Sequence, residues 1–385
     1  MATTIISGVQ YSGIWSLAGQ ANAKALGTWT GIPSYPLYSW GVNSAGQLGL
    51  GNTTSYSSPK QVGSLTTWLD LTCGYRQTLA TKTDGTLWGV GFNQYGQLGN
   101  GATANLSSIV QIGALTNWLK IASSSYFTLA TKTDGTLWTM GQNNFGQLGL
   151  GNLTYYSSPK QIGALTSWLN IAGGNYFSLA TKTDGTLWSW GRNPGGALGL
   201  GNLTNYSSPK QVGALTDWLK ATGGNSHTIA LKTDGTLWSW GRNGFGQLGL
   251  GNITYYSSPK QIGSLTSWAN ITCGQNQTFA VKNDGTLWSW GANGVGELGL
   301  NNTTGYSSPK QVGVLTSWLT PVSGRQFCMA IKTDGTLWSW GRNQSGQLGL
   351  GNITNYSSPN QVGALTWSKI ACGNVYTAGI PVIYT

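Results

Sequence analysis

Residues 168–213 read WLNIAGGNYFSLATKTDGTLWSWGRNPGGALGLGNLTNYSSPKQVG, and this stretch decides the fold. WLNIA is a short apolar run, and YFSLATK alternates apolar and polar residues in the way a strand does. Asp184-Gly185 then forms a two-residue turn of the kind that joins antiparallel strands. TLWSWG continues as a third strand, and a Gly- and Asn-rich loop leads to PKQVG, a fourth strand with Pro at its start. The stretch therefore predicts a four-stranded antiparallel unit.

The same unit recurs along the chain with a period of 50 residues. The string DGTLW begins at Asp84, Asp134, Asp184, Asp234, Asp284 and Asp334, and the string GxLTxW begins at Gly63, Gly113, Gly163, Gly213, Gly263 and Gly313, with a variant copy at Gly363. The N-terminal copy, from Ser34, holds only the second half of the unit, and the C-terminal copy holds only the first half.

This pattern predicts an all-β fold, a seven-bladed β-propeller of four-stranded antiparallel blades. An open array of blades would leave strand edges unpaired. We therefore expect the N- and C-terminal strands to share one blade and to close the ring.

The composition argues against an enzyme. Charged residues make up 8% of the 385 residues, and there is one His, whereas an ordinary soluble domain has about 25% charged residues. Proton-transfer catalysis needs a positioned carboxylate, His or Cys, so we predict no catalytic residues. No apolar run reaches the roughly 18 residues of a membrane-spanning helix, and we identify no secretory signal at the N-terminus.

Motifs that suggest cofactors occur in the wrong context. GFGQLG at 244–249 and GVGELG at 294–299 match a dinucleotide-binding pattern, but that pattern requires a following helix, and a turn follows here. The four cysteines show no C-x-x-C spacing, so we predict no metal site. The single His227 stands where other copies have Gln, Phe or Tyr, and a structural or surface role is favoured over catalysis. We predict no cofactor.

Three segments of one copy resemble a known repeat. They are SWGRNGFGQLGLGN at 239–252, SSPKQI at 257–262 and GGNSHTIAL at 223–231, and they are similar to the regulator of chromosome condensation repeat. The resemblance covers residues 31–385 and recurs seven times. It implies a ring used as a binding platform, in a family that includes a guanine-nucleotide exchange factor, a plant photoreceptor and a β-lactamase inhibitor. A shared fold does not imply a shared function.

Three stretches of each copy vary while their flanks stay constant. One joins the first and second strands, and the other two lie between the third and fourth strands. In an up-and-down blade these connections emerge on the same side of the ring, which we call the variable face. We predict that this face binds a partner, because it is rich in Tyr, Phe and Arg. Neutral variation of exposed loops is the alternative explanation.

The predicted contact residues are Tyr75, Arg76, Phe92, Tyr95, Tyr126, Phe127, Phe145, Tyr155, Tyr176, Phe177, Arg192, His227, Arg242, Phe245, Arg325, Phe327, Arg342 and Tyr376.

The net charge of +11 is consistent with an anionic partner such as nucleic acid, polysaccharide or an acidic protein. The lysines, however, are spread by the repeat instead of forming one patch. Solubility and protection of strand edges are therefore the preferred explanation of the charge. We expect a protein or a cell-surface glycan as the partner and consider nucleic acid less favoured.

Residues 1–30 lie outside the repeat, and YSGIWSLAGQANAK at 11–24 resembles N-terminal pieces of tail-fibre-like and other virion proteins of marine tailed bacteriophages. The resemblance implies that Tyr11, Ile14, Trp15 and Leu17 attach the chain to other virion proteins. We therefore expect an attachment segment at residues 1–30 and a propeller at residues 31–385.

The leading hypothesis is a non-enzymatic binding platform of the phage particle, a fibre or decoration protein that recognises the host. One alternative is a bacterial protein-binding module or inhibitor in the cytoplasm. A less favoured alternative is an exchange factor or chromatin-type regulator, which rests on family analogy alone.

Overall fold

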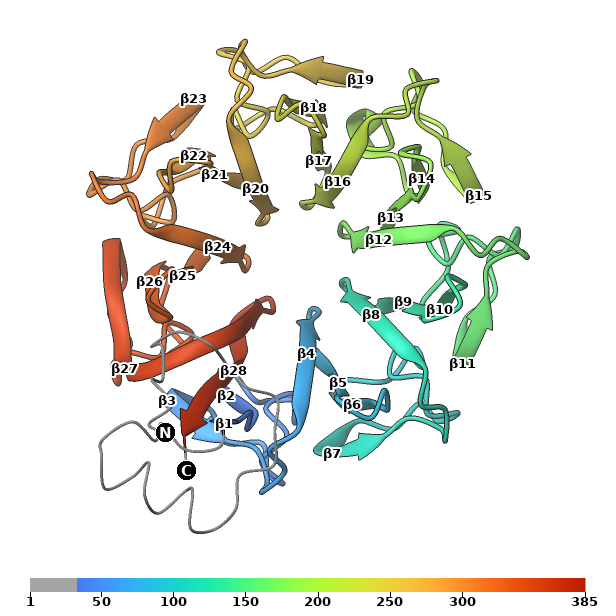
Figure 1. Ribbon diagram of the computed structural model, residues 1–385, viewed down its shortest axis with the longest axis vertical. Coiled ribbons are helices and arrows are strands. Elements are labelled where there is room, and N and C mark those ends of the chain that lie inside the picture. Colours follow the sequence, from blue (N-terminus) through green and yellow to red (C-terminus); the bar gives the residue numbers. More distant parts are fainter. Residues whose placement is uncertain (1–32, 385) are drawn as a thin grey trace, which may run out of the picture.

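The computed structural model describes residues 33–384, which form a ring of seven blades around a central opening (Figure 1). The predicted all-β fold is confirmed. Within the described residues the only helix is a short 3₁₀ turn, η1 (Pro194–Gly196). The blades are numbered here I to VII along the chain.

Blades I to V are four-stranded antiparallel sheets of consecutive strands. Blade I contains β4 (Trp68–Cys73), β5 (Gln77–Lys82), β6 (Leu87–Gly91) and β7 (Leu106–Gln111); blade II contains β8 (Trp118–Ser123), β9 (Phe127–Lys132), β10 (Leu137–Gly141) and β11 (Tyr156–Gln161); blade III contains β12 (Trp168–Gly173), β13 (Phe177–Lys182), β14 (Leu187–Gly191) and β15 (Tyr206–Gln211). Blade IV contains β16 (Trp218–Gly223), β17 (His227–Lys232), β18 (Leu237–Gly241) and β19 (Tyr256–Gln261); blade V contains β20 (Trp268–Cys273), β21 (Gln277–Lys282), β22 (Leu287–Gly291) and β23 (Tyr306–Gln311).

The last two blades share a long strand. Blade VI contains β24 (Trp318–Ser323), β25 (Phe327–Lys332), β26 (Thr336–Gly341) and the first part of β27 (Tyr356–Cys372). Blade VII contains the last part of β27, β28 (Tyr376–Tyr384), β2 (Tyr38–Gly41) and β3 (Tyr56–Gln61), and the short β1 (Pro33–Ser34) pairs with the end of β28.

The two ends of the chain therefore close the ring, as predicted. β2, from the N-terminal side, pairs antiparallel with β28, from the C-terminal side, in the register Tyr38↔Gly379 and Gly41↔Tyr376. Each end supplies two strands of blade VII, and these strands lie next to each other in Figure 1. This pairing leaves no gap in the ring.

The fourth strand of each blade differs from its predicted bounds. In blade III it begins at Tyr206 and ends at Gln211, whereas the sequence predicts PKQVG at 209–213. The strand starts earlier because Tyr206 pairs with Gly191 across an irregularity in the register. Pro209 lies inside this outermost strand, where a missing N–H group is tolerated on the unpaired edge.

The hydrophobic core lies between blades. Trp118 and Met140 of blade II pack in one cluster with Leu87 and Ile112 of blade I, and equivalent clusters recur around the ring. Hydrogen bonds follow the same boundary, since Trp190 Nε1 of blade III donates to the carbonyl oxygen of Gln147 (3.0 Å). Each blade is thus completed by its neighbour.

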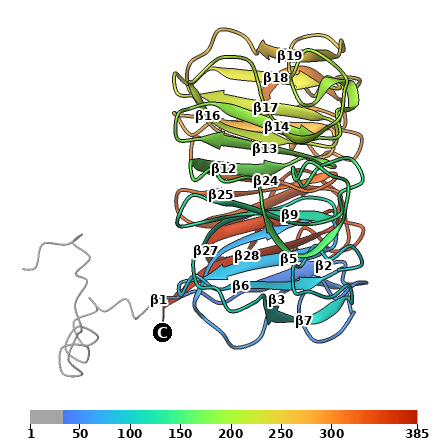
Figure 2. The same ribbon diagram turned by 90° about the vertical axis from the view of Figure 1, so that its right-hand side faces the viewer.

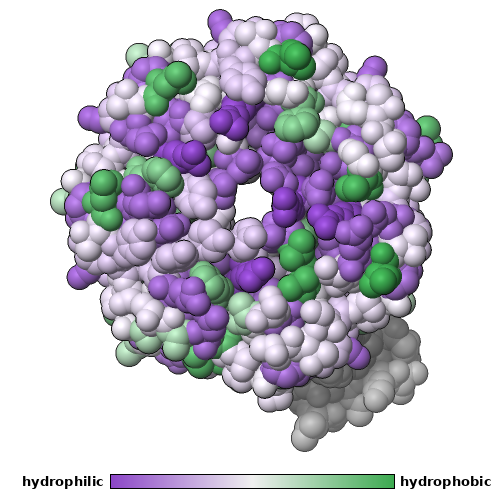
Figure 3. Space-filling model, turned by 180° about the vertical axis from the view of Figure 1, so that it is seen from behind, coloured by the Kyte–Doolittle hydropathy of each residue, from purple (hydrophilic) through white to green (hydrophobic). Residues whose placement is uncertain are grey.

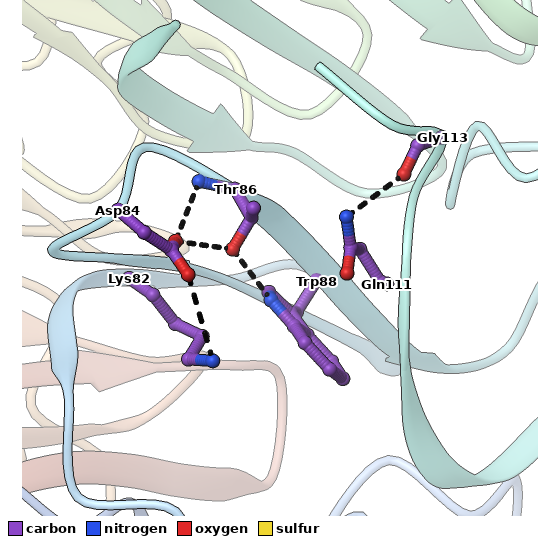
Figure 4. Close-up of polar contacts among 6 residues, drawn as sticks. All are labelled: Lys82, Asp84, Thr86, Trp88, Gln111 and Gly113. Carbon is purple, nitrogen blue, oxygen red and sulfur yellow. Dashed lines mark hydrogen bonds and ion pairs between the residues drawn. The ribbon is translucent and has the colours of Figure 1, made fainter. Parts of the chain in front are cut away.

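The face turned to the viewer in Figure 1 carries the Asp-Gly turns and the GxLTxW connections, and we call it the turn face. In the copy shown in Figure 4, Asp84 Oδ1 accepts hydrogen bonds from the backbone N–H (3.0 Å) and hydroxyl (2.6 Å) of Thr86. Thr86 Oγ1 in turn accepts a bond from Trp88 Nε1 (2.8 Å). Lys82 Nζ lies 5.0 Å from the centre of the Trp88 ring. The lysines at the equivalent positions of the next five blades pack on tryptophan in the same way.

One position on the inner strands carries an acidic, a basic or an uncharged polar side chain, depending on the blade. It is the third residue of each, namely Asp70, Lys120, Asn170, Lys220, Asn270, Thr320 and Lys369. Lys120 Nζ donates to Asn170 Oδ1 (2.7 Å), and Lys220 Nζ donates to Asn270 Oδ1 (2.7 Å). Lys369 Nζ lies 3.8 Å from Asp70 Oδ1, across the junction between blades VII and I.

Two turn glycines provide a matched test of these connections. Gly135 has φ +77°, and a Cβ atom there would lie 1.9 Å from the carbonyl oxygen of Thr166. Gly335 has a similar φ of +80°, but its nearest neighbour would be Thr366 Cβ at 3.1 Å. We expect Gly335→Ala to cost about 1 kcal/mol from backbone strain alone, and Gly135→Ala about 3 kcal/mol or more because of the added clash.

Thermal unfolding of both variants beside the parent chain measures this difference. Equal melting temperatures of the two variants would contradict the structural account of the turn.

Candidate functional site

The variable face is formed by two kinds of connection that lie side by side. In blade III, the backbone N–H of Arg192, which follows β14, donates to the carbonyl oxygen of Tyr176 (2.9 Å), which precedes β13. The same bond recurs in other blades, for example from Arg342 to Gln326 (2.8 Å). The predicted meeting of the variable stretches on one face is therefore confirmed.

Figure 2 shows β1 and the C-terminal end of β28 on one side of the ring, the turn face. Figure 3 shows the other side, the variable face. Mostly hydrophilic residues border the central opening on this face, and isolated hydrophobic residues lie farther out. The exposed apolar side chains of the long loops include Leu153, Leu203, Ile253 and Ile353.

An aromatic patch occupies the variable face over blades I to III. Its members are Tyr75, Phe92, Tyr95, Tyr126, Phe145, Tyr155 and Tyr176. Tyr126 is central, with ring centroids 5.2 Å from Tyr75 and 5.3 Å from Tyr95. Most of the rings are half-buried, and Tyr155 at the edge is 42% exposed. The structure thus brings together seven of the predicted contact residues from three different blades.

Burial and three neighbouring phenol groups raise the pKa of Tyr126 to about 12. The hydroxyl group is therefore protonated at neutral pH and available as a hydrogen-bond donor. The patch offers apolar ring surface together with phenolic donors, a combination typical of recognition surfaces.

Arginines accompany the patch. Arg76 lies over the Tyr75 ring at 5.5 Å, and Arg192 lies over the Phe145 ring at 4.9 Å. Arg242 and Phe245 are exposed on blade IV, with Phe245 57% accessible. Arg325 and Arg342 belong to blade VI, so these predicted residues lie on the face but away from the patch.

The central opening forms a cavity of about 570 Å³ lined by the ends of the inner strands. Its mouth on the variable face carries polar side chains, of which Arg325 was predicted and Ser125, Asn175, Asn225 and Gln275 were missed by sequence reasoning. Ser125 Oγ donates to Asn175 Oδ1, Asn175 Nδ2 donates to Asn225 Oδ1 (2.6 Å), and Arg325 Nε donates to Gln275 Oε1 (3.0 Å). The available signal was that these residues directly precede the first variable stretch and differ between copies.

Five predicted contact residues are wrong as surface residues. Phe127, Phe177, His227, Phe327 and Tyr376 are fully buried. Each is the first residue of the second strand of its blade, where the side chain packs inward. Phe177 shares a strand face with Leu179, two residues later, and this period of two was the signal that placed it inside.

The same inward position is filled by polar side chains in other blades. Gln77 Nε2 donates to the carbonyl oxygen of Ser124 in the next blade (2.9 Å), and Tyr376 Oη donates to the carbonyl oxygen of Gln77. His227 Nε2 lies 3.2 Å from Thr278 Oγ1. Variation at this position therefore reflects alternative ways of joining blades.

The titratable groups offer no metal cage in the part of the chain that the structure describes, because no three His, Cys, Asp or Glu side chains converge there. Cys73, Cys273 and Cys328 are buried, and burial raises the pKa of each thiol. Between residues 33 and 384, no helix is long and apolar enough to cross a membrane. The predicted attachment residues Tyr11, Ile14, Trp15 and Leu17 lie outside the described residues.

Comparison with known proteins identifies the repeat. The sequence pattern of the RCC1-like domain matches residues 34–267, and that of the regulator of chromosome condensation (RCC1) repeat matches residues 284–331 and 334–380. A comparison with curated protein sequences gives no match.

Several solved structures share the fold. Human WBSCR16 is 20% identical, with a TM-score of 0.81 over 90% of this chain and 99% of that chain. Yeast RCC1 (Prp20), solved with Kap60, is 19% identical, with a TM-score of 0.82 over 100% of this chain and 96% of that chain. Saccharomyces cerevisiae Prp20p, whose binding to Gsp1p and histones has been characterised, is 19% identical, with a TM-score of 0.81 over 95% of each chain.

The buried histidine gives a prediction for acid stability. Burial lowers the pKa of His227 to about 3, whereas an unfolded His titrates near pH 6.5. Between these values the unfolded chain binds the extra proton, so stability falls as the pH falls from about 6.5 towards 3. His227→Gln, which installs the residue found at positions 77 and 277, removes this dependence.

Thermal unfolding between pH 7 and pH 4 provides the measurement. We expect the parent chain to lose about 2–3 kcal/mol more than His227→Gln over this range. Parallel stability curves for the two proteins would show that His227 is not buried in its neutral form.

Proposed function

Because this chain belongs to the RCC1-like propeller family, we propose that it is a non-enzymatic binding platform that holds a partner on its variable face. The observation that carries the proposal is the aromatic patch, which gathers Tyr and Phe side chains from three blades on the one face where the copies differ. The turn face, by contrast, repeats nearly the same residues in each blade.

The positions of the reactive side chains support a non-enzymatic role. Six of the nine carboxylates belong to Asp-Gly turns, where Thr hydroxyl groups hydrogen-bond them. The single histidine is buried and neutral in the core. General acid–base chemistry needs such groups beside a substrate site, and the cavity at the ring centre is lined mainly by small and amide side chains.

A protein is the preferred partner. Tyr and Arg are enriched at the energetic centres of protein interfaces, and the patch combines seven aromatic residues with Arg76 and Arg192. A cell-surface glycan is the second candidate, because half-exposed tyrosine rings and hydroxyl groups also suit sugars. Nucleic acid is less favoured, since no row of cations follows the aromatic residues.

We further propose that the platform belongs to a phage particle, as a fibre or decoration protein for host recognition. This part rests on the resemblance of residues 11–24 to virion proteins, and residues 1–30 would attach the propeller to other virion proteins. A bacterial binding module or inhibitor in the cytoplasm is the alternative. An exchange-factor role, by analogy with yeast RCC1, is less favoured because a likeness at 19% identity supports the fold alone.

Site-specific photo-crosslinking tests the binding face. A photoreactive phenylalanine analogue at Tyr155 or Phe245, both exposed on the variable face, should capture the same partner in the native host cells. The matched control places it at Leu165 or Leu265, each 49% exposed on the turn face, where no capture is expected.

Once the partner is captured, Tyr126→Ala and Tyr176→Ala should weaken its binding by about tenfold or more, because both rings lie inside the patch. Leu165→Ala should leave the affinity unchanged. Capture from the turn face alone, or normal affinity of both tyrosine variants, would refute the proposed face.

Mass spectrometry of purified phage particles tests the particle role. We expect the full chain in the particles and the loss of a variant that lacks residues 1–30. Detection of the chain only in the bacterial cytoplasm would favour the alternative.

A further inference from the structure

The cations of this chain are sorted by residue type between the two faces. All five arginines, Arg76, Arg192, Arg242, Arg325 and Arg342, lie in the variable connections after an inner strand or after a third strand. The lysines of the described chain lie elsewhere: beside the Asp-Gly turns, along the outermost strands, or at the start of inner strands near the turn face. The repeat alone does not require this separation.

The carboxylates are absent from the surface that carries the arginines. Seven of the nine lie in connections of the turn face, and Asp70 lies at the start of β4, next to Lys369. Glu297 alone is near the variable face, but it is 1% exposed, and its carboxylate accepts the backbone N–H of Val295 (2.8 Å). Residues 1–32 contain no Asp or Glu.

The guanidinium groups therefore lack acidic partners. Every ion pair found within residues 33–384 involves a lysine. The buried Nε of Arg76 has no hydrogen-bond partner among these residues. Arg325 uses only its Nε, on Gln275, and the guanidinium carbon of Arg192 lies 4.9 Å from the centre of the Phe145 ring and 5.9 Å from that of Tyr176. Arg342 differs, because its Nε and both Nη groups donate to Gln344 and Gln326. The terminal N–H groups of the other arginines are available to a partner that supplies acceptors.

We propose that the variable face binds an acidic protein surface whose carboxylates pair with these arginines, with the aromatic patch as the apolar anchor. This inference rests on the proposed function and adds the chemistry of the partner. Arginine presents a planar fork that matches a carboxylate, which the ammonium group of lysine does not. A face with five such forks and no exposed carboxylate repels basic surfaces and attracts acidic ones.

The spacing of the arginines favours a protein over a continuous polyanion. They belong to blades I, III, IV and VI, and uncharged surface separates them. A nucleic acid or sulfated polysaccharide presents a regular row of charges, which proteins follow with contiguous Lys and Arg residues. Arginines that are separated from one another instead match single carboxylates scattered over a folded partner.

The test compares two variants with the same change in net charge. One replaces the five arginines by Gln, and the other replaces five outer-strand lysines by Gln (K60Q, K160Q, K210Q, K260Q and K310Q). Binding of each full-length protein to a peptide of Glu separated by Gly and Ser residues, which carries isolated carboxylates, is measured at about 150 mM salt. We expect the arginine variant to bind at least about tenfold more weakly and the lysine variant to bind like the parent chain.

Two further measurements keep the result interpretable. A five-fold Arg→Lys variant retains the charge, and it should bind more weakly than the parent chain if the guanidinium fork is used. Should the arginine variant fail to fold, R76Q/R192Q/R242Q replaces it, with K160Q/K210Q/K260Q as its control, because Arg325 and Arg342 also bond to neighbouring glutamines.

The proposal is overturned if the peptide with spaced glutamates does not bind, if both charge variants lose binding equally, or if only oligothymidylate or heparin binds through the arginines. If a partner crosslinks at Tyr155 and Phe245 equally well in the parent chain and in the arginine variant, this inference is overturned and the proposed function stays intact. Crosslinking only from the turn face would overturn both.

Discussion

A single blade cannot bury its own apolar surface, and this constraint governs the whole molecule. The tryptophan that begins each inner strand packs against the preceding blade, as Trp118 does against Leu87 and Ile112. The second tryptophan of the third strand adds a hydrogen bond across the same boundary. Because every blade is completed by its neighbour, an open array would leave an uncovered apolar face and unpaired strand edges at its ends. The pairing of β2 with β28 in blade VII, which joins the two ends of the chain, prevents such open ends.

The two faces of the ring are subject to different structural restraints. On the turn face, Gly135 passes so close to Thr166 that the backbone leaves no room for a side chain. On the variable face, buried asparagines such as Asn143 hold the long loop through bonds to Asn152 and Leu148, and outward positions between these anchors are unconstrained. Chemical variety therefore collects on one side of a ring whose interior is nearly uniform.

Much of the fold could be predicted from the sequence because the determining signals are local and repeated. Asp-Gly turns and a 50-residue period give the blades, and the unequal halves at the two ends predict the shared blade. The direction of the strands also predicts which connections share a face. The aromatic patch is different, because the contact of Tyr126 with Tyr75 and Tyr95 depends on the spacing and tilt of separate blades.

The errors in the predicted site have one physical origin. Tyr176 and Phe177 are adjacent and both vary between copies, yet one lies on the surface and the other in the core. In a repeated sequence, residues that differ between copies because they are exposed cannot be told from residues that differ because several side chains can fill the same core position. His227, Gln77 and Phe127 fill the same inward position with different chemistry. Whether the first residue of a strand is buried or exposed must therefore be inferred from the alternation of inward and outward side chains along that strand, and not from how much the residue varies between copies.

The third position of the inner strands carries unlike side chains at several junctions between near-identical blades. Lysine faces asparagine from blade II to blade III and from blade IV to blade V, and Lys369 faces Asp70 where the ends of the chain meet. A ring that omitted blade I would bring Lys369 beside Lys120, and these two like charges would repel each other. Loss of blade I would therefore replace an attractive contact between Lys369 and Asp70 by a repulsive one, a restraint that the repetitive core does not supply.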